Sequence, residues 1–199
     1  MTEEKSILLA IASRILIYPD EDFSSERAEM EEAVQDITAP DLKNAISKAM
    51  KPIYLLPLPE LQELYVQTFD YKEKTGLYLT AHEMGDSRKR GSALIELQQM
   101  IQEAGFVQTN EELADYIPML LEFLAVAPED IDCSRLRRRL AFAIDQILSH
   151  LPQENPYAGI LQVLMTFIFD SPTAAEIAEF KKEHEKADLD PLPYPLLYQ

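Results

Sequence analysis

The sequence predicts a single all-helical domain, built as a bundle of about eight or more helices. Apolar residues recur every three or four positions through most of the 199 residues, which is the spacing of one face of a helix. The chain has no alternating apolar and polar runs and no Asn-Gly or Asp-Gly turn, so nothing in it predicts a β-hairpin. No internal repeat or low-complexity linker divides it.

Four helices are expected before residue 70. The first carries an apolar stripe from Ile7 to Leu16, and the second, at about 25–37, is mostly charged. Pro40 begins the third, because proline is favoured in the first turn of a helix. Prolines at 57 and 59 separate the third helix from a fourth, whose apolar stripe runs from Leu61 to Phe69.

The middle of the chain is less regular. Residues 70–87 are expected to form a loop with a short turn of helix, followed by a long helix that ends near Gly105. Asn110 resembles the N-cap of the next helix, whose apolar stripe occupies 113–124. Pro118 falls inside that stripe, which implies either a kink or a helix start displaced toward the proline.

Three further helices are expected in the C-terminal part. Asp132 is expected to cap the first, and Asn155-Pro156 to begin the second, which is apolar nearly all round from Ile160 to Phe169 and therefore central. The segment from Tyr157 to Phe169 is too short to span a bilayer. Ser171-Pro172 begins the last helix. We expect a helical domain over residues 1–187 and a proline-rich extended tail over 188–199.

Charge and composition exclude several classes of function. The chain has 18 Lys and Arg against 35 Asp and Glu, a net charge of −17, which disfavours nucleic acid and favours a basic peptide as partner. A single cysteine, Cys133, cannot form an intrachain disulfide or a cysteine-rich metal or iron–sulfur site. The acidic N-terminus is not a secretory signal, and a lone thiol suits a reducing compartment, so we expect a cytoplasmic protein.

Residues that could support catalysis are few. His82-Glu83-Met84-Gly85-Asp86 partly matches the HExxH metal motif, with Asp86 in the place of the second ligand. The alternative is that His82 is hydrogen-bonded inside a packed loop. Nothing specifies a nucleophile or an acid–base pair, and no glycine-rich phosphate loop occurs, so we expect no enzyme activity and no bound metal.

Basic and aromatic clusters are the other candidate features. Arg88-Lys89-Arg90 lies at a probable helix start, where cations oppose the helix dipole, so it marks either a functional site or pairing with nearby carboxylates such as Asp86. A second cluster, Arg135 with residues 137–139, is interpreted as a solvated helix face. Aromatic residues between 54 and 78, interleaved with acidic ones, either belong to the core or line a groove for a basic amphipathic helix.

Several segments resemble the signature of the NarJ family, within the wider TorD/DmsD group of redox-enzyme maturation chaperones. The matching segments are Tyr65–Asp70 (YVQTFD), Leu77–Glu83 (LYLTAHE), Gly85–Gly91 (GDSRKRG), Glu112–Pro118 (ELADYIP) and Leu121–Leu124 (LEFL). The resemblance implies a TorD-like, all-helical chaperone without a cofactor. It implies binding to the apo catalytic subunit of respiratory nitrate reductase through that subunit's N-terminal basic amphipathic peptide, until molybdenum cofactor and an iron–sulfur cluster are inserted and before membrane docking.

The resemblance also suggests which residues contact the client. They are Tyr65, Phe69, Asp70, Tyr78, His82, Glu83, Asp86, Arg88, Arg90, Asp115, Tyr116 and Glu122. Two alternatives stay open at this point. One is a related chaperone for another molybdoenzyme, and the other is a metal-dependent enzyme that uses His82, Glu83 and Asp86.

Overall fold

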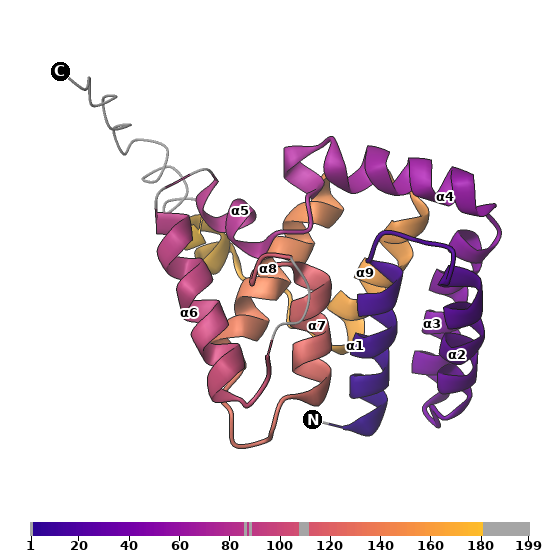
Figure 1. Ribbon diagram of the computed structural model, residues 1–199, viewed down its shortest axis with the longest axis horizontal. Helices are drawn as coiled ribbons and strands as arrows, with labels where there is room; N and C mark the ends of the chain where they lie inside the picture. The colour runs from indigo at the N-terminus through magenta and orange to yellow at the C-terminus, as the bar shows by residue number, and fades with distance from the viewer. Residues whose placement is uncertain (1, 86, 88, 108–111, 181–199) are drawn as a thin grey trace.

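The fold of the protein is described by a computed structural model over residues 2–85, 87, 89–107 and 112–180 (Figure 1). Within those ranges the regular structure is helical, apart from one isolated β-bridge between Tyr78 and Tyr116. The all-helical prediction is therefore confirmed. The tail expected at 188–199 lies outside the described residues, as does the end of the predicted domain.

The helices follow one another through the described chain with short connections. Their bounds are α1 Glu3–Ile15, α2 Phe23–Gln35, α3 Pro40–Tyr54, α4 Leu58–Tyr65, α5 Leu79–Met84, α6 Lys89–Glu103, α7 Ile117–Val126, α8 Ser134–His150 and α9 Pro156–Phe167. A π-helical turn, η1 (Val66–Asp70), continues α4, and a 3₁₀ turn, η2 (Glu73–Thr75), follows it. Residues 174–180 form one more short helix.

The core lies where α1, α7, α8 and α9 meet. α1 packs against α7 and α9, while α3 packs against the other side of α9. α2 and α3 form one flank, α5 and α6 the other, and α4 with η1 lies across one end (Figure 1). Ile160 and Leu161 of α9 have no exposed surface, so the helix expected to be central is central, although it ends at Phe167. No helix in the described ranges is both long and apolar enough to cross a membrane.

Helix boundaries follow the local signals at most positions. Pro40 is in the first turn of α3, and the side chain of Asn155 accepts a hydrogen bond from the Tyr157 amide at the start of α9. Gly105 has a φ of +85° after α6, where a left-handed residue allows the chain to leave the helix. Asp132 accepts a hydrogen bond of 2.9 Å from the Ser134 amide, although Cys133 is the residue that directly precedes α8.

The helix expected from Asn110 begins later. Asn110 lies outside the described residues, residues 114 and 115 form a turn, and α7 begins at Ile117 with Pro118 in its first turn. A helix start displaced toward Pro118 is one of the two alternatives that the sequence left open, and the structure has it. Proline suits this place because it has no N–H to donate and the first-turn amides have no helical partner.

Two glycines make a matched test of helix packing. A Cβ added at Gly159 of α9 would lie 3.2 Å from the Cα of Ala49 in α3, whereas one added at Gly91 of α6 would have no atom within 4 Å. We expect Gly159→Val to lower the free energy of unfolding by about 1–3 kcal/mol through overpacking. We expect Gly91→Ala to raise it by up to about 1 kcal/mol, since alanine favours a helix. Urea denaturation of both variants tests this, and a stabilising Gly159→Val would contradict it.

Candidate functional site

Two extended segments pair beside the core and create the framework of the candidate site. The Leu79 amide donates to the carbonyl of Asp115 at 2.9 Å, and the Ile117 amide donates to the carbonyl of Leu77 at 2.8 Å. The Asp115 carbonyl and the Ile117 amide therefore bond between the two segments, whereas in an α7 that began earlier they would form hydrogen bonds within the helix. This pairing brings Tyr78 next to Tyr116, with ring centroids 5.6 Å apart.

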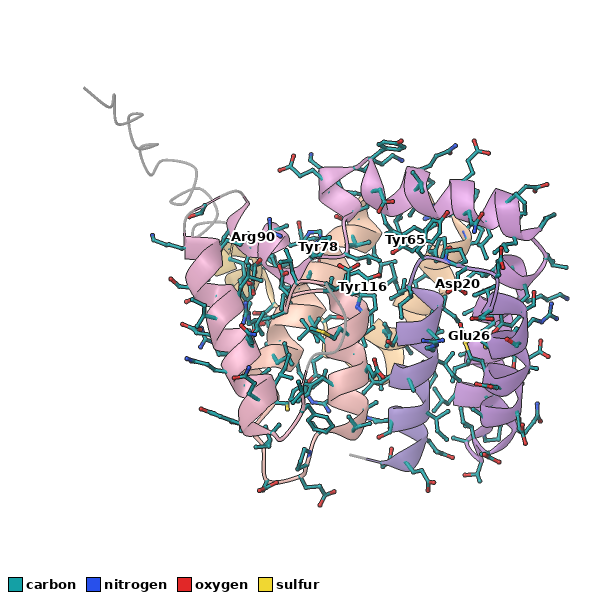
Figure 2. The ribbon with its side chains drawn as sticks, in the orientation of Figure 1. Asp20, Glu26, Tyr65, Tyr78, Arg90 and Tyr116 are labelled. Carbon is teal, nitrogen blue, oxygen red and sulfur yellow. The ribbon has the colours of Figure 1, made fainter. Side chains whose placement is uncertain are left out.

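A pocket of about 310 Å³ opens between these segments, the end of α1 and the end of α4. We call it the tyrosine groove. It is lined by Ile17, Tyr18, Tyr65, Phe69, Asp70, Leu77, Tyr78, Glu112 and Tyr116. Figure 2 shows Tyr65, Tyr78 and Tyr116 close together near the middle of the view, between Arg90 on one side and Asp20 on the other. Five of the residues predicted to contact a client therefore share one groove: Tyr65, Phe69, Asp70, Tyr78 and Tyr116.

The rings of the groove are held in place by hydrogen bonds and edge contacts. The hydroxyls of Tyr65 and Tyr116 lie 3.2 Å apart, and the Tyr65 hydroxyl donates to the Leu16 carbonyl at 3.3 Å. Burial raises the pKa of Tyr116 to about 12, so these phenols stay neutral at physiological pH. Tyr18, which is 45% exposed, meets the Tyr65 ring edge-on with centroids 5.4 Å apart. The groove thus offers one exposed ring, that of Tyr18, beside the buried rings of Tyr65 and Tyr116.

Two carboxylates give the groove its negative charge. Burial, together with the neighbouring charge of Glu112, raises the pKa of Asp70 above its ordinary value. The hydroxyl of Tyr78 donates to Glu112 at 2.9 Å, and this contact, with burial, raises the pKa of Tyr78. Because the two carboxylates repel one another, a cation placed between them would be stabilised. Aromatic walls with carboxylates at one side suit a peptide that is apolar on one face and basic on another.

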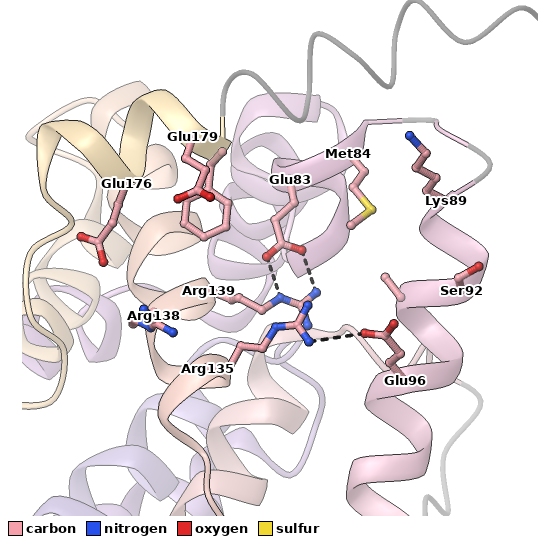
Figure 3. A pocket seen from close by; sticks show the side chains of 12 residues that line it. Glu83, Met84, Lys89, Ser92, Glu96, Arg135, Arg138, Arg139, Glu176 and Glu179 are labelled. Atoms are coloured by element: carbon pink, nitrogen blue, oxygen red, sulfur yellow. Dashed lines mark hydrogen bonds and ion pairs between the residues drawn. The ribbon is translucent and has the colours of Figure 1, made fainter.

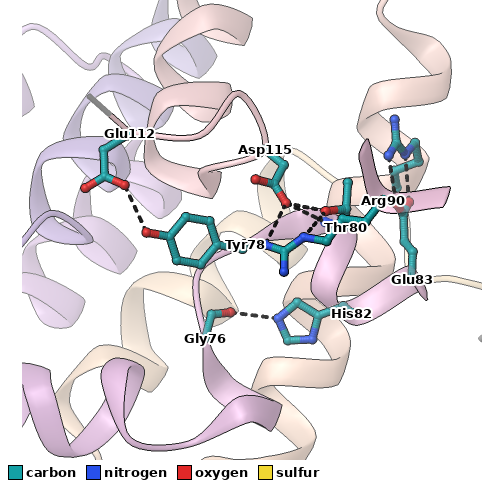
Figure 4. Close-up of polar contacts among 9 residues, drawn as sticks. Gly76, Tyr78, Thr80, His82, Glu83, Arg90, Glu112 and Asp115 are labelled. Atoms are coloured by element: carbon teal, nitrogen blue, oxygen red, sulfur yellow. Dashed lines mark hydrogen bonds and ion pairs between the residues drawn. The ribbon is translucent and has the colours of Figure 1, made fainter. Parts of the chain in front are cut away.

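Behind the groove, Asp115 joins the two paired segments from below the surface. It has no exposed area, and one of its oxygens accepts hydrogen bonds from the amide of Thr80, at 3.1 Å, and from the Thr80 hydroxyl. Arg90 donates to the same hydroxyl at 3.0 Å and lies 3.7 Å from the carboxylate (Figure 4). Asp115 and Arg90 therefore position the wall that carries Tyr78, rather than forming its surface.

His82 and Glu83 contact different partners. The ring Nε2 of His82 donates to the Gly76 carbonyl at 2.7 Å, as the packed-loop alternative expected. Glu83 forms a two-point ion pair with Arg139 of α8, with both N–O distances 2.7 Å (Figure 3). Asp86 lies outside the described residues, and within them no group of three ligating side chains could hold a metal ion.

The interpretation of Arg139 as part of a solvated face was wrong. Its side chain is buried at the junction of α5 and α8, and burial is possible because Glu83 satisfies the guanidinium at two points. Hydrogen bonding and the charge of Glu83 outweigh the desolvation of the group and raise the pKa of Arg139. Arg138, one residue earlier, is exposed as expected.

A comparison with known protein families shows which family this chain belongs to. The family model described as nitrate reductase delta subunit matches residues 27–153, which include α3 to α8 and every element of the tyrosine groove except the end of α1. The chain belongs to this family. The resemblance to NarJ proteins is thereby confirmed.

Two curated relatives and one solved structure are similar to this chain along most of their length. The chain is 30% identical to a nitrate reductase molybdenum cofactor assembly chaperone NarJ of Bacillus subtilis, over 82% of this chain and 89% of the relative. It is 29% identical to the NarJ chaperone of Escherichia coli K12, over 92% and 80%. A redox enzyme maturation protein from Archaeoglobus fulgidus shares the fold, with a TM-score of 0.59, 20% identity, and coverage of 82% and 93%.

Not every residue that was predicted to contact a client is found in the tyrosine groove of this nitrate reductase delta subunit family member. Glu122 is exposed on α7, away from the residues that line the groove. Asp86 and Arg88 lie outside the described residues. Conversely, the site prediction omitted Tyr18 and Glu112, which line the groove. No local signal identifies Tyr18, because only the packing of α1 against α7 and the contact of its ring with that of Tyr65 bring it there.

Proposed function

We propose that this chain is an assembly chaperone for the catalytic subunit of a respiratory nitrate reductase, and that it binds the N-terminal basic amphipathic peptide of that subunit in the tyrosine groove. The relatives named NarJ in Bacillus subtilis and Escherichia coli support the chaperone role. The observation that carries the binding site is the groove itself, in which Tyr18, Tyr65 and Tyr78 meet two carboxylates.

The chemistry of the groove suits a helical peptide. An amphipathic helix would place its apolar face on the rings, and a Lys or Arg side chain one turn away would approach Asp70 and Glu112. The aromatic faces around that cation add a cation–π contribution. Asp115 and Arg90 act indirectly in this proposal, by holding Tyr78 and the segment that carries it.

In this proposal the chaperone acts by binding its client and does not catalyse a reaction. Binding the apo subunit in the cytoplasm keeps its N-terminal segment from the membrane anchor while the molybdenum cofactor and the iron–sulfur cluster are inserted. The net charge of −17 keeps the free chaperone soluble and favours encounter with a basic segment. A client that must be released later calls for moderate affinity, which a small groove with one charged contact provides.

Charge reversal in the groove tests the proposal. We expect Asp70→Lys to weaken binding of the synthetic N-terminal peptide of the nitrate reductase catalytic subunit by about tenfold or more, or about 1.4 kcal/mol, measured by calorimetry. The reason is that the lysine replaces an attractive carboxylate by a repulsive cation. The matched control is Glu60→Lys, which changes the same charge at an exposed position of α4 outside the groove.

The control separates local recognition from the general field of an acidic protein. Equal weakening by Asp70→Lys and Glu60→Lys would contradict a site in the groove. Failure of the unmodified chain to bind the peptide would contradict the client itself. The N-terminal peptide of another molybdoenzyme, tested in parallel, separates the two chaperone alternatives, since the true client should bind more tightly.

A further inference from the structure

A second pocket, of about 360 Å³, lies between α5, α6 and α8 and is closed on one side by helix 174–180 (Figure 3). We call it the α6–α8 pocket. Its α6 and α8 walls carry Lys89, Arg135 and Arg138, and helix 174–180 contributes Glu176, Glu179 and Phe180. None of these residues lines the tyrosine groove.

The α8 wall of the α6–α8 pocket is basic in a strongly acidic protein. The α8 wall carries three arginines, Arg135, Arg138 and Arg139, and the walls from α5 and α6 carry two carboxylates, Glu83 and Glu96. Glu83 is bound to Arg139, and Glu96 lies 3.8 Å from Arg135. The two carboxylates of helix 174–180 supply charge opposite to that of Arg138, so this helix is complementary in charge to the α8 wall.

Helix 174–180 is anchored by one aromatic contact. The ring of Phe180 stacks on that of Phe142 in α8, with centroids 4.4 Å apart and planes at 21°. Phe142 is buried, but among the described residues it is not a member of the main core cluster. Covering Phe142 is therefore the apolar contribution that this helix makes to the fold.

The hydrogen bonds of helix 174–180 within the described chain are local to its own start. Its start is set locally, because the amide and hydroxyl of Thr173 donate to Glu176 at 2.8 Å and the Glu176 amide returns a bond to that hydroxyl. Within the described chain, no ion pair joins Glu176 or Glu179 to Arg135 or Arg138, although the charge of Arg138 helps to lower the pKa of Glu176.

These observations describe a complementary but poorly filled site. We propose that the α6–α8 pocket is a second binding surface, for an acidic helical segment of a partner protein that carries one aromatic side chain. Helix 174–180 is the internal occupant that such a segment displaces. Its own chemistry, two carboxylates one turn apart followed by an aromatic ring, shows what the pocket accepts. The proposal does not depend on which peptide the tyrosine groove binds.

A peptide competition on the full chain tests the displacement. The probe is a fluorescein-labelled synthetic peptide with the sequence of residues 171–180, followed by fluorescence anisotropy. The native chain should bind it weakly, because its own helix competes at a high effective concentration. Phe180→Ala, which removes the anchor of the internal helix, should bind the probe at least about tenfold more tightly. Adding Arg138→Glu to the Phe180→Ala variant should abolish this gain in affinity for the probe.

Two controls make the outcome decisive. In the Phe180→Ala background, Arg137→Glu changes the same charge on α8 outside the pocket and should preserve binding. Glu176→Lys, which places like charge near Arg138, replaces Phe180→Ala if that variant does not fold. Equal probe binding by the native and opened chains would overturn the proposal, as would equal losses from Arg137→Glu and Arg138→Glu. If the native chain were a dimer in analytical sedimentation and the dimer did not bind the probe, the pocket would be assigned to a second copy of the chain. That result would also overturn the proposal.

Discussion

Replacing Arg139 by methionine is expected to lower the free energy of unfolding by about 3–5 kcal/mol. The guanidinium contacts both oxygens of Glu83 at 2.7 Å, and both side chains are buried. Removing one partner leaves the other charge largely buried and unpaired, and the loss of solvation without a compensating partner is the source of the cost. Urea denaturation followed by circular dichroism measures the change, from the midpoint and the slope.

The pair offers two controls. Arg138→Met changes the neighbouring, exposed arginine of α8 and should alter stability by less than about 0.5 kcal/mol. The double variant Glu83→Leu with Arg139→Met should recover much of the loss, because apolar side chains of similar size can replace a buried ion pair. If the single variant Arg139→Met were as stable as the native chain, the burial of this pair would be disproved.

Replacing Asp115 by alanine is expected to have the second largest effect, a loss of about 2–3 kcal/mol in the free energy of unfolding. The buried amide of Thr80 loses its acceptor, and Arg90 loses the carboxylate 3.7 Å away. Because these contacts hold the segment that carries Tyr78, affinity for the client peptide should fall as well. Thermal unfolding and calorimetry on the same preparation measure both.

Asp115→Asn separates charge from geometry. Asparagine keeps an oxygen that can accept from the Thr80 amide, so we expect it to retain more stability than alanine does. The hydrogen bond from the Tyr65 hydroxyl to the Leu16 carbonyl does not involve the Asp115 segment and should remain in both variants. A stability loss with unchanged peptide affinity would show that Asp115 supports the fold without positioning the groove.

The fold could be read from local patterns because helices depend on neighbours three and four residues apart. Pro40, Gly105 and Asn155 mark boundaries where the structure has them, since each acts through its own backbone or an adjacent amide. Asn110 was a misleading signal. The start of α7 depends on the pairing of 77–79 with 115–117, and no pattern within the segment reveals a partner that far away.

The residues of the candidate site, like the helix boundaries, were predicted only in part from the sequence. Resemblance to the family selected Tyr65, Asp70 and Tyr78, and these residues lie in one groove. It also selected Glu83 and Asp115, which the structure places beneath the surface. Residue type and motif identify which side chains are unusual, but they do not say which way a side chain points.

By itself, the sequence determined that the protein is helical, acidic and related to the NarJ family, because composition, period and motif are local properties of the chain. Only the tertiary structure decided that Arg139 is buried against Glu83, 56 residues away, and that Asp115 is bonded to Thr80, 35 residues away. It also decided that Tyr18 lines the groove. The reason is physical: burial and pairing are set by which helices pack together, and that choice minimises exposed apolar surface over the whole chain.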